Sequence, residues 1–378
     1  MEMLMDSCPD SSKSMFRSLA ESRPASMLLL CVIFWITAAA SFSGFYGKWK
    51  LLDGQEKNGI EQILNASAHK PFVYRQLVPM LSALANQLTP DSLKNDILKV
   101  ATTKVKSVAS MNRELAFRYM TVYVICFFSL FFSLLVLREI TLDAGAGKVA
   151  AVFAPLSFAL AFPYLQTKGG YYYDITELLF LSLAFLAASR GRILLLLTLL
   201  LPATLNKETF IFFIPALYPL LRCHFSMKKV LILISAAIFA AGIVNILTKL
   251  AFYDLPGGAL EFYLLQNLRA FINPQSYGQL EITYGIIGPS GTFIGTLAVV
   301  LIILFRGWPQ IPLVLKRHLF IASAINFPLF LLFAYPGELR NLSFLFIGFV
   351  ILMAFVIEQS GSIFKSSVGL ERRQVNEG

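Results

Sequence analysis

The sequence predicts an all-α, polytopic transmembrane helix bundle of about ten helices. Of the 378 residues, 57% are hydrophobic and only 14% are charged, a composition that excludes a soluble globular domain. Continuous apolar runs of helical length recur along the chain, whereas a transmembrane barrel would show short strands of alternating polarity. Residues 1–378 are therefore expected to form a single transmembrane domain, with both termini, 1–25 and 359–378, in the cytoplasm.

Each apolar run is expected to cross the membrane as a helix. A crossing needs roughly 20 apolar residues to traverse a hydrocarbon core of about 30 Å. In chain order the runs are 26–43, 117–137, 149–165, 175–189, 193–205, 209–221, 229–248, 292–305, 319–335 and 342–357. The fifth and sixth form a doubtful pair, because the stretch 193–221 is too long for one ordinary crossing and too short for two. Its centre is the polar tetrapeptide Asn206-Lys207-Glu208-Thr209.

Lysine and arginine in the short loops decide between one long helix and a hairpin over residues 193–221, because cytoplasmic loops carry an excess of both. With ten helices and a cytoplasmic N-terminus, most basic loop residues fall inside: Arg138, Lys148, Arg190, Arg192, Arg222, Lys228, Lys229, Arg306, Lys316 and Arg317. The short outer loops hold only Lys168, Lys207 and Arg340. A single crossing would place the later basic loops outside, so the sequence favours a hairpin with its charged tip on the outer side.

Two long segments, 44–116 and 250–291, are expected on the outer side. The first contains two amphipathic runs, at 60–64 and 77–88, that predict short helices lying in the membrane interface. The second is rich in aromatic and turn residues, which is typical of a segment at the headgroup boundary.

The unusual polar residues all fall on the outer face of this topology. They come from four separated parts of the chain: 74–75, 169–177, 206–208 and 338–341. Lysine and arginine there could hold a phosphate or diphosphate head group, with arginine giving a bidentate grip. A nearby carboxylate could accept a proton from an acceptor hydroxyl, and tyrosines could offer a sugar their flat faces. This set suits glycosyl transfer from a lipid-phosphate-linked donor.

Simpler structural explanations exist for the two carboxylates of the fourth helix. Asp174 could merely stabilise the helix N-terminus, where a negative charge is worth roughly 0.3–1 kcal/mol. Glu177 is followed by apolar residues, and a lone carboxylate within the bilayer costs ~2.5–3.5 kcal/mol, so it needs a partner. Lys207 or Arg340 could be that partner in a purely structural ion pair.

Three local motifs follow one another along the chain: residues 172–180 at a helix start, the turn 190–192, and residues 205–209 running into an apolar helix with Pro215. In these motifs the chain resembles the GT-C superfamily of integral-membrane glycosyltransferases. The resemblance implies an enzyme of cell-surface glycan assembly in the bacterial inner membrane, with its active face outward. The implied partners are a polyprenyl-phosphate-linked sugar donor, a glycan or lipid acceptor and membrane lipids. No nucleic acid is expected as a partner, because the sequence has no basic stripe with interleaved aromatic residues.

The resemblance leaves the catalytic base open between Asp53, Asp174 and Glu177. Relatives carry an acidic residue close to the first helix, where Asp53 is the nearest aspartate and Glu56 and Glu61 are alternatives. The paired acidic motif of several families is absent. Asp174 ranks first, because its position does not depend on how the long outer segment folds. The donor phosphate is expected to bind Lys207, Arg75 and Arg340, with support from Glu208, Asn206, Glu338, Tyr172 and Tyr173. No cofactor or metal ligand is assigned, although some relatives need a divalent ion such as Mg or Mn.

Two other activities fit the same features. An O-antigen-type polymerase or ligase would rely on arginines in long outer loops, for which Arg75 and Arg269 are candidates. A transporter or flippase of lipid-linked sugars would use broken helices and charges near mid-membrane, usually within inverted repeats. No such repeat is evident in the sequence, which favours the enzyme.

Overall fold

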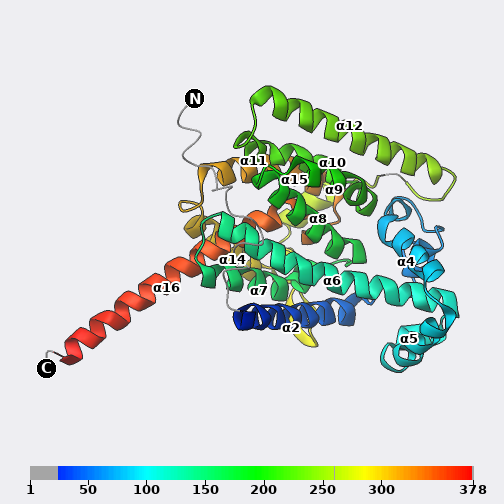
Figure 1. Ribbon diagram of the computed structural model, residues 1–378, viewed down its shortest axis with the longest axis horizontal. Coiled ribbons are helices and arrows are strands. Elements are labelled where there is room, and N and C mark those ends of the chain that lie inside the picture. Colours follow the sequence, from blue (N-terminus) through cyan, green and yellow to red (C-terminus); the bar gives the residue numbers. More distant parts are fainter. Residues whose placement is uncertain (1–23, 259, 377–378) are drawn as a thin grey trace.

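The computed structural model describes residues 24–258 and 260–376, with side chains through residue 361. Seven of the described helices are long and apolar enough to cross a membrane. They are α2 (Pro24–Trp49), α6 (Arg113–Asp143), α7 (Lys148–Leu165), α8 (Tyr172–Ser189), α12 (Met227–Ala251), α15 (Leu313–Phe333), and α16 (Phe346–Asn376) with the preceding 3-10 turn η6 (Leu339–Leu345). The predicted fold class, an all-α bundle of apolar helices, is confirmed (Figure 1).

The other three expected crossings are helical but short. They are α9 (Ile193–Asn206), the run of α10 (Phe210–Phe213), η4 (Ile214–Leu217) and α11 (Tyr218–Arg222), and α14 (Ile294–Gly307). A helix of 14 residues is about 21 Å long, less than a hydrocarbon core of about 30 Å. The count of ten crossings and the cytoplasmic placement of the termini therefore stay predictions. Most of the predicted N-terminal segment, 1–23, lies outside the described residues.

The two long connecting segments are more structured than the sequence predicts. Between α2 and α6 lie α3 (Ile60–Leu64), η2 (Phe72–Tyr74), α4 (Leu77–Leu88), α5 (Asp91–Lys104) and η3 (Lys106–Ser110). The two expected short helices are present, whereas α5 was not expected because its sequence is mostly polar. The second segment holds α13 (Leu264–Ile272), η5 (Pro274–Gly278), and an antiparallel hairpin of β1 (Leu280–Thr283) and β2 (Ile286–Pro289). This hairpin is the one departure from an all-α fold in the described part of the chain.

The helices run between two ends of the bundle. At the loop end, where the two long segments lie, the backbone N–H of Lys70 donates to the carbonyl of Pro256 (2.9 Å). At the opposite end, the N–H of Gly147 donates to the Glu358 carboxylate (3.0 Å). Figure 1 shows α4 and α5 at the loop end and the last turns of α16 projecting from the opposite end. The chain therefore alternates between the ends in the order expected from the loop charges.

Residues 193–221 reverse direction, as predicted for a hairpin. At the loop end, the Asn206 side chain that closes α9 donates to the carbonyl of Tyr173 at the start of α8 (3.0 Å). At the opposite end, the ring of His224, just after α11, bonds to the carbonyl of Ser189 at the end of α8 (2.7 Å). Both arms thus follow α8, and the alternative of one long helix is wrong.

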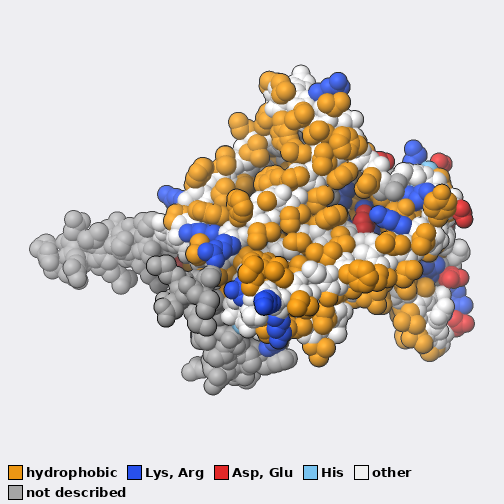
Figure 2. All heavy atoms as spheres, turned by 90° about the horizontal axis from the view of Figure 1, so that it is seen from above, with side chains coloured by type: hydrophobic (Ala, Val, Ile, Leu, Met, Phe, Trp, Pro, Cys, Tyr) orange, Lys and Arg blue, Asp and Glu red, His pale blue; other side chains and the backbone are white. Residues whose placement is uncertain are grey.

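The surface of the bundle is strongly apolar. Hydrophobic side chains cover the middle of the face seen in Figure 2. Acidic side chains gather at the end that carries α4 and α5, whereas basic side chains lie toward both ends. Of the most apolar 18 residues of α12, only 17% are buried, compared with 83% for α8. Soluble proteins rarely expose so continuous an apolar surface, which fits contact with lipid. The helix α8 is the most enclosed candidate span, and its loop end carries the candidate site.

Candidate functional site

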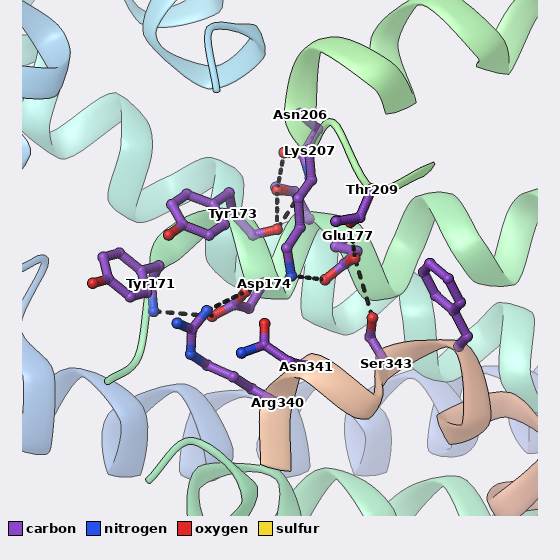
Figure 3. A network of polar contacts seen from close by, with 12 residues as sticks. Tyr171, Tyr173, Asp174, Glu177, Asn206, Lys207, Thr209, Arg340, Asn341 and Ser343 are labelled. Carbon is purple, nitrogen blue, oxygen red and sulfur yellow. Dashed lines mark hydrogen bonds and ion pairs between the residues drawn. The ribbon is translucent and has the colours of Figure 1, made fainter. Parts of the chain in front are cut away.

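Four charged side chains from three separated segments meet at the loop end of α8 (Figure 3). Lys207 Nζ donates to Glu177 Oε2 (2.6 Å) and to Asp174 Oδ1 (3.2 Å). Arg340 Nη1 donates to both carboxylate oxygens of Asp174 (3.2 and 3.1 Å). Each of the four residues is exposed by 6% or less. We call Asp174, Glu177, Lys207 and Arg340 the buried charge cluster.

The first turn of α8 places both carboxylates on one side of the helix. Asp174 accepts the backbone N–H of Tyr171 at Oδ2 (3.2 Å), so it caps the helix N-terminus as well as binding two cations. Glu177 follows three residues later and therefore lies on the same face as Asp174. Asp174 therefore caps the helix, as the structural explanation expects, and binds two cations in addition. The cationic partner of Glu177 is Lys207.

Asn206 fixes the position of Lys207 next to these carboxylates. The Asn206 side chain is buried, accepts the hydroxyl of Thr176 and donates to the carbonyl of Tyr173 (3.0 Å). Because both bonds go to α8, the end of α9 is held against the start of that helix. The next residue, Lys207, lies outside the regular helix and turns its side chain inward. Lys207 is therefore buried next to Asp174 and Glu177.

Arg75 reaches the same region from the first long segment. Its Nη2 and Nε donate to the two oxygens of Glu208 (2.9 and 3.3 Å), and its Nη1 donates to the hydroxyl of Tyr173. Burial alone would lower the pKa of Arg75, but the attraction of the Glu208 carboxylate outweighs burial and raises it above its usual value. Arg75 is therefore a permanent cation bound in a bidentate ion pair. Tyr172 supports it by donating its hydroxyl to the carbonyl of Arg75 (3.2 Å).

Aromatic rings separate the two guanidinium groups. Phe72 stacks on Tyr171 at 5.4 Å between centroids, and Tyr171 stacks on Tyr173 at 4.9 Å. Arg340 lies 4.6 Å from the Tyr171 centroid, and Arg75 lies 4.2 Å from that of Tyr173. The tyrosines are buried, so they are not simple interfacial residues. Their faces are also occupied by these neighbours, which leaves little free ring surface for a sugar.

Lys207, Arg340 and Arg75 are each paired with a carboxylate. Lys207 and Arg340 share Asp174, and Arg340 Nη2 also donates to Glu338 (3.2 Å), whose other partner is the side chain of Asn341 (2.8 Å). An incoming phosphate would therefore compete with carboxylates rather than meet free cations. One donor is still unused: Arg340 Nε is buried and has no hydrogen-bond partner among the described residues.

Asp53 lies apart from the buried charge cluster. It follows α2, and its Oδ2 accepts the hydroxyl of Tyr119 (3.2 Å). Its Oδ1 is buried without a hydrogen-bond partner among the described residues. In that part of the chain no hydrogen bond or ion pair joins Asp53 directly to the cluster. It is the one proposed base that the structure leaves outside.

The turn that carries Asp53 nevertheless packs against the start of α8. The Trp49 indole donates to the carbonyl of Gln166 (2.8 Å), and Asn58 donates to the hydroxyl of Tyr171 (2.8 Å). Gly170 permits this approach, since a Cβ there would lie 2.3 Å from the Trp49 ring. Asp53 therefore lies at the same end of the molecule as the buried charge cluster.

Two hydroxyl groups that the sequence analysis did not place in the site donate further hydrogen bonds to Glu177. Ser343 donates to its Oε1 at 3.1 Å and Thr209 donates to the same atom at 3.4 Å. Isolated serine and threonine residues carry no positional signal, so only the fold could identify them. Arg269, considered for a polymerase or ligase, lies exposed on α13. Within the described residues no group of three or more His, Cys, Asp and Glu side chains is arranged to hold a metal ion.

No protein-family model, curated protein or solved structure matches this chain. The resemblance to the GT-C superfamily therefore depends on the motifs of the sequence alone.

Proposed function

We propose that the protein is a membrane glycosyltransferase, which moves a sugar from a polyprenyl-phosphate-linked donor to a glycan or lipid acceptor on the extracytoplasmic face. The observation that carries this proposal is the buried charge cluster in an apolar helical bundle. Charged groups at such positions are costly to bury, and they are rare in membrane-spanning segments unless they serve a function. The cluster draws its members from α8, the α9–α10 turn and η6, which is how a bundle assembles a site.

Arg340 and Lys207 are the proposed contacts of the donor phosphate. The unused Arg340 Nε could bind a phosphate oxygen while Nη1 stays on Asp174. Lys207 could exchange one carboxylate contact for a second phosphate oxygen, since it already divides its charge between Asp174 and Glu177. Arg75 is a weaker candidate than its type suggests, because Glu208 and Tyr173 occupy all three of its guanidinium nitrogens.

Asp53 is the proposed general base. Both oxygens of Asp174 and both of Glu177 accept hydrogen bonds in the buried charge cluster, so neither has an oxygen free for a proton. Asp53 has the unpartnered Oδ1, which could accept the proton of an acceptor hydroxyl. This reverses the ranking favoured by the sequence. Asp174 and Glu177 become positioning residues that hold the two cations.

The test is sugar transfer by the full chain reconstituted in liposomes with a panel of polyprenyl-phosphate-linked hexoses and N-acetylhexosamines. Release of polyprenyl phosphate and formation of a glycosylated acceptor are measured by mass spectrometry. Asp53→Asn should lower turnover by about 10²-fold or more, the usual contribution of a general base, with donor binding unchanged. Asp96→Asn, in the exposed polar helix α5 of the same segment, is the matched control and should keep the wild-type rate.

The same assay separates the rival activities. Movement of an intact donor between leaflets, without release of polyprenyl phosphate, would replace the enzyme by a transporter or flippase. Release of polyprenyl diphosphate from an oligosaccharide-loaded carrier would indicate a polymerase or ligase. Wild-type turnover in Asp53→Asn would remove Asp53 from the mechanism while leaving the enzyme class intact.

A further inference from the structure

A cavity of about 700 Å³ lies at the end of the bundle opposite the buried charge cluster. It is bounded by the end of α11, the start of α12, the residues after α14 and the start of α15. Aromatic and aliphatic side chains form much of its wall, among them Trp308, Tyr218 and Phe320. Three cationic residues also line it: Arg222, Lys316 and Arg317.

These three cations have no carboxylate partner in the part of the chain that the structure describes. Arg222 Nη1 donates to the carbonyl of Phe225 (2.6 Å), and Lys316 Nζ lies 3.5 Å from the carbonyl of Pro309. Neither contact neutralises a positive charge, and none of the described residues that line the cavity is acidic. The cavity therefore combines an apolar wall with three uncompensated positive charges.

Membrane orientation alone does not explain this arrangement. Lys148, Arg192 and Lys228 belong to the same end and also contribute to the predicted inside-positive bias, but they are exposed and line no part of this cavity. Arg190, at that end too, is bound to Asp143 in an ion pair. Arg222, Lys316 and Arg317 differ from these residues in that they line an apolar cavity.

We propose that this cavity binds an anionic membrane phospholipid, with its phosphate on Arg222, Lys316 and Arg317 and acyl chain against the aromatic wall. The volume falls within the range of about 300–1,000 Å³ that is usual for small-molecule sites. Basic pockets between membrane helices are suited to anionic lipid headgroups. A free anion would gain nothing from the apolar wall, and a neutral lipid would gain little from three cations.

This site is separate from the proposed catalytic region. The helix α15 begins at the cavity with Lys316 in its first turns and ends at Phe333, shortly before Arg340. At 1.5 Å per residue its length is about 30 Å. The lipid site therefore requires none of the residues placed in sugar transfer, and it can be tested without any glycosyl donor.

Binding is measured by native mass spectrometry on the full chain in a neutral detergent. The probes are phosphatidylglycerol and phosphatidylcholine with identical acyl chains. The wild type should bind phosphatidylglycerol at least tenfold more tightly. Lys316→Gln/Arg317→Gln should raise the Kd for phosphatidylglycerol about 30-fold, the effect of two lost attractions to a headgroup with a net negative charge. The Kd for phosphatidylcholine, whose choline balances its phosphate, should rise much less. Lys148→Gln/Arg192→Gln removes the same charge from the same end and should leave both affinities unchanged.

Two further measurements address the lipid itself. Leu313→Trp narrows the cavity from a half-exposed position without removing a cation, and should also weaken phosphatidylglycerol binding. Excess inorganic phosphate should not displace the lipid. Equal binding of the two lipids, wild-type affinity in Lys316→Gln/Arg317→Gln or in Leu313→Trp, or displacement by phosphate alone would each overturn the proposal.

Discussion

The buried charge cluster and the cavity at the opposite end show two ways of using basic residues in one helical bundle. At the loop end, Lys207 and Arg340 lie inside the protein and are held by carboxylates. At the opposite end, Lys316 and Arg317 line an open cavity without a carboxylate among the described residues. The type of residue alone therefore does not predict whether a site will accept an external anion. What predicts whether a site accepts an external anion is the positive charge that remains after pairing with carboxylates of the same chain.

This difference changes how each region should respond to mutation. Removing one partner of a buried ion pair destabilises the folded protein, because the remaining charge stays unpaired in an apolar environment. Replacing a cation that faces a cavity removes only an interaction with a ligand. Stability measurements should therefore separate the two regions before any activity is known.

Lys207→Met should give the largest loss of stability. It leaves Glu177 and Asp174 buried with fewer partners, and breaking a buried pair typically costs about 3–5 kcal/mol. The measurement is the unfolding free energy of the purified protein in detergent. Lys316→Met, the same change at the cavity, is the matched control and should stay within about 0.5 kcal/mol of wild type. Adding Glu177→Gln to Lys207→Met should restore part of the loss.

Equal stability of Lys207→Met and Lys316→Met would contradict the comparison, because it would mean that the cluster is hydrated rather than buried. The expected loss also affects the choice of functional variants. Inactivity of a Lys207 variant could result either from loss of a contact with the substrate or from loss of folded protein. Asp53→Asn is therefore the preferred test of catalysis.

Arg75→Lys should have the next largest effect. Lysine keeps the charge but cannot reproduce the bidentate contact with Glu208 or the stacking on Tyr173. A loss of about 1.5–3 kcal/mol is expected, the usual contribution of hydrogen bonds to charged groups. Arg317→Lys, at an exposed position of the cavity, should be neutral in the same unfolding assay. If Arg75→Lys were neutral as well, the ion pair with Glu208 would not stabilise the fold.

Acid should weaken the Arg75–Glu208 pair. Glu208 lies in the turn between α9 and α10, outside the candidate membrane spans. Burial alone would raise the pKa of Glu208, but the Arg75 guanidinium outweighs burial and holds it below its usual value. Since the unfolded pKa is about 4.3, the stabilisation is complete above that pH and is lost as the pH falls through the folded pKa. The stability difference between wild type and Glu208→Gln should therefore shrink from about pH 6 to about pH 3. A constant difference would mean that Glu208 does not titrate in this way.

Much of the buried charge cluster could be predicted from the sequence, because the number of preceding helices determines at which end of the bundle each loop lies. The loop charges indicated that 193–221 reverses direction, and this placed Lys207 at the same end as Asp174 and Arg340. The unfavourable burial of Glu177 already required a cationic partner. Periodicity and loop charge thus predicted which residues meet without any knowledge of packing.

The remaining features depend on packing that sequence patterns do not encode. The pairing of Arg75 with Glu208 joins residues 133 positions apart, so it was invisible to local spacing. The short hairpin β1–β2 was missed because a turn-rich segment gives no clear alternation of polarity. The cavity forms where four helix ends meet, and its cations appeared in the sequence only as orientation signals.

The smallest stability effect is expected from Lys316→Gln/Arg317→Gln in lipid-free detergent. Both side chains are at least partly exposed and form no ion pair within the described residues, so the free energy of unfolding should change by less than about 0.5 kcal/mol. Adding phosphatidylglycerol should then raise the thermal unfolding midpoint of the wild type more than that of the variant, because a ligand stabilises only a folded state that binds it. A large loss in lipid-free detergent would show that these cations belong to the fold, as Lys207 does, and the contrast between the two ends of the bundle would disappear.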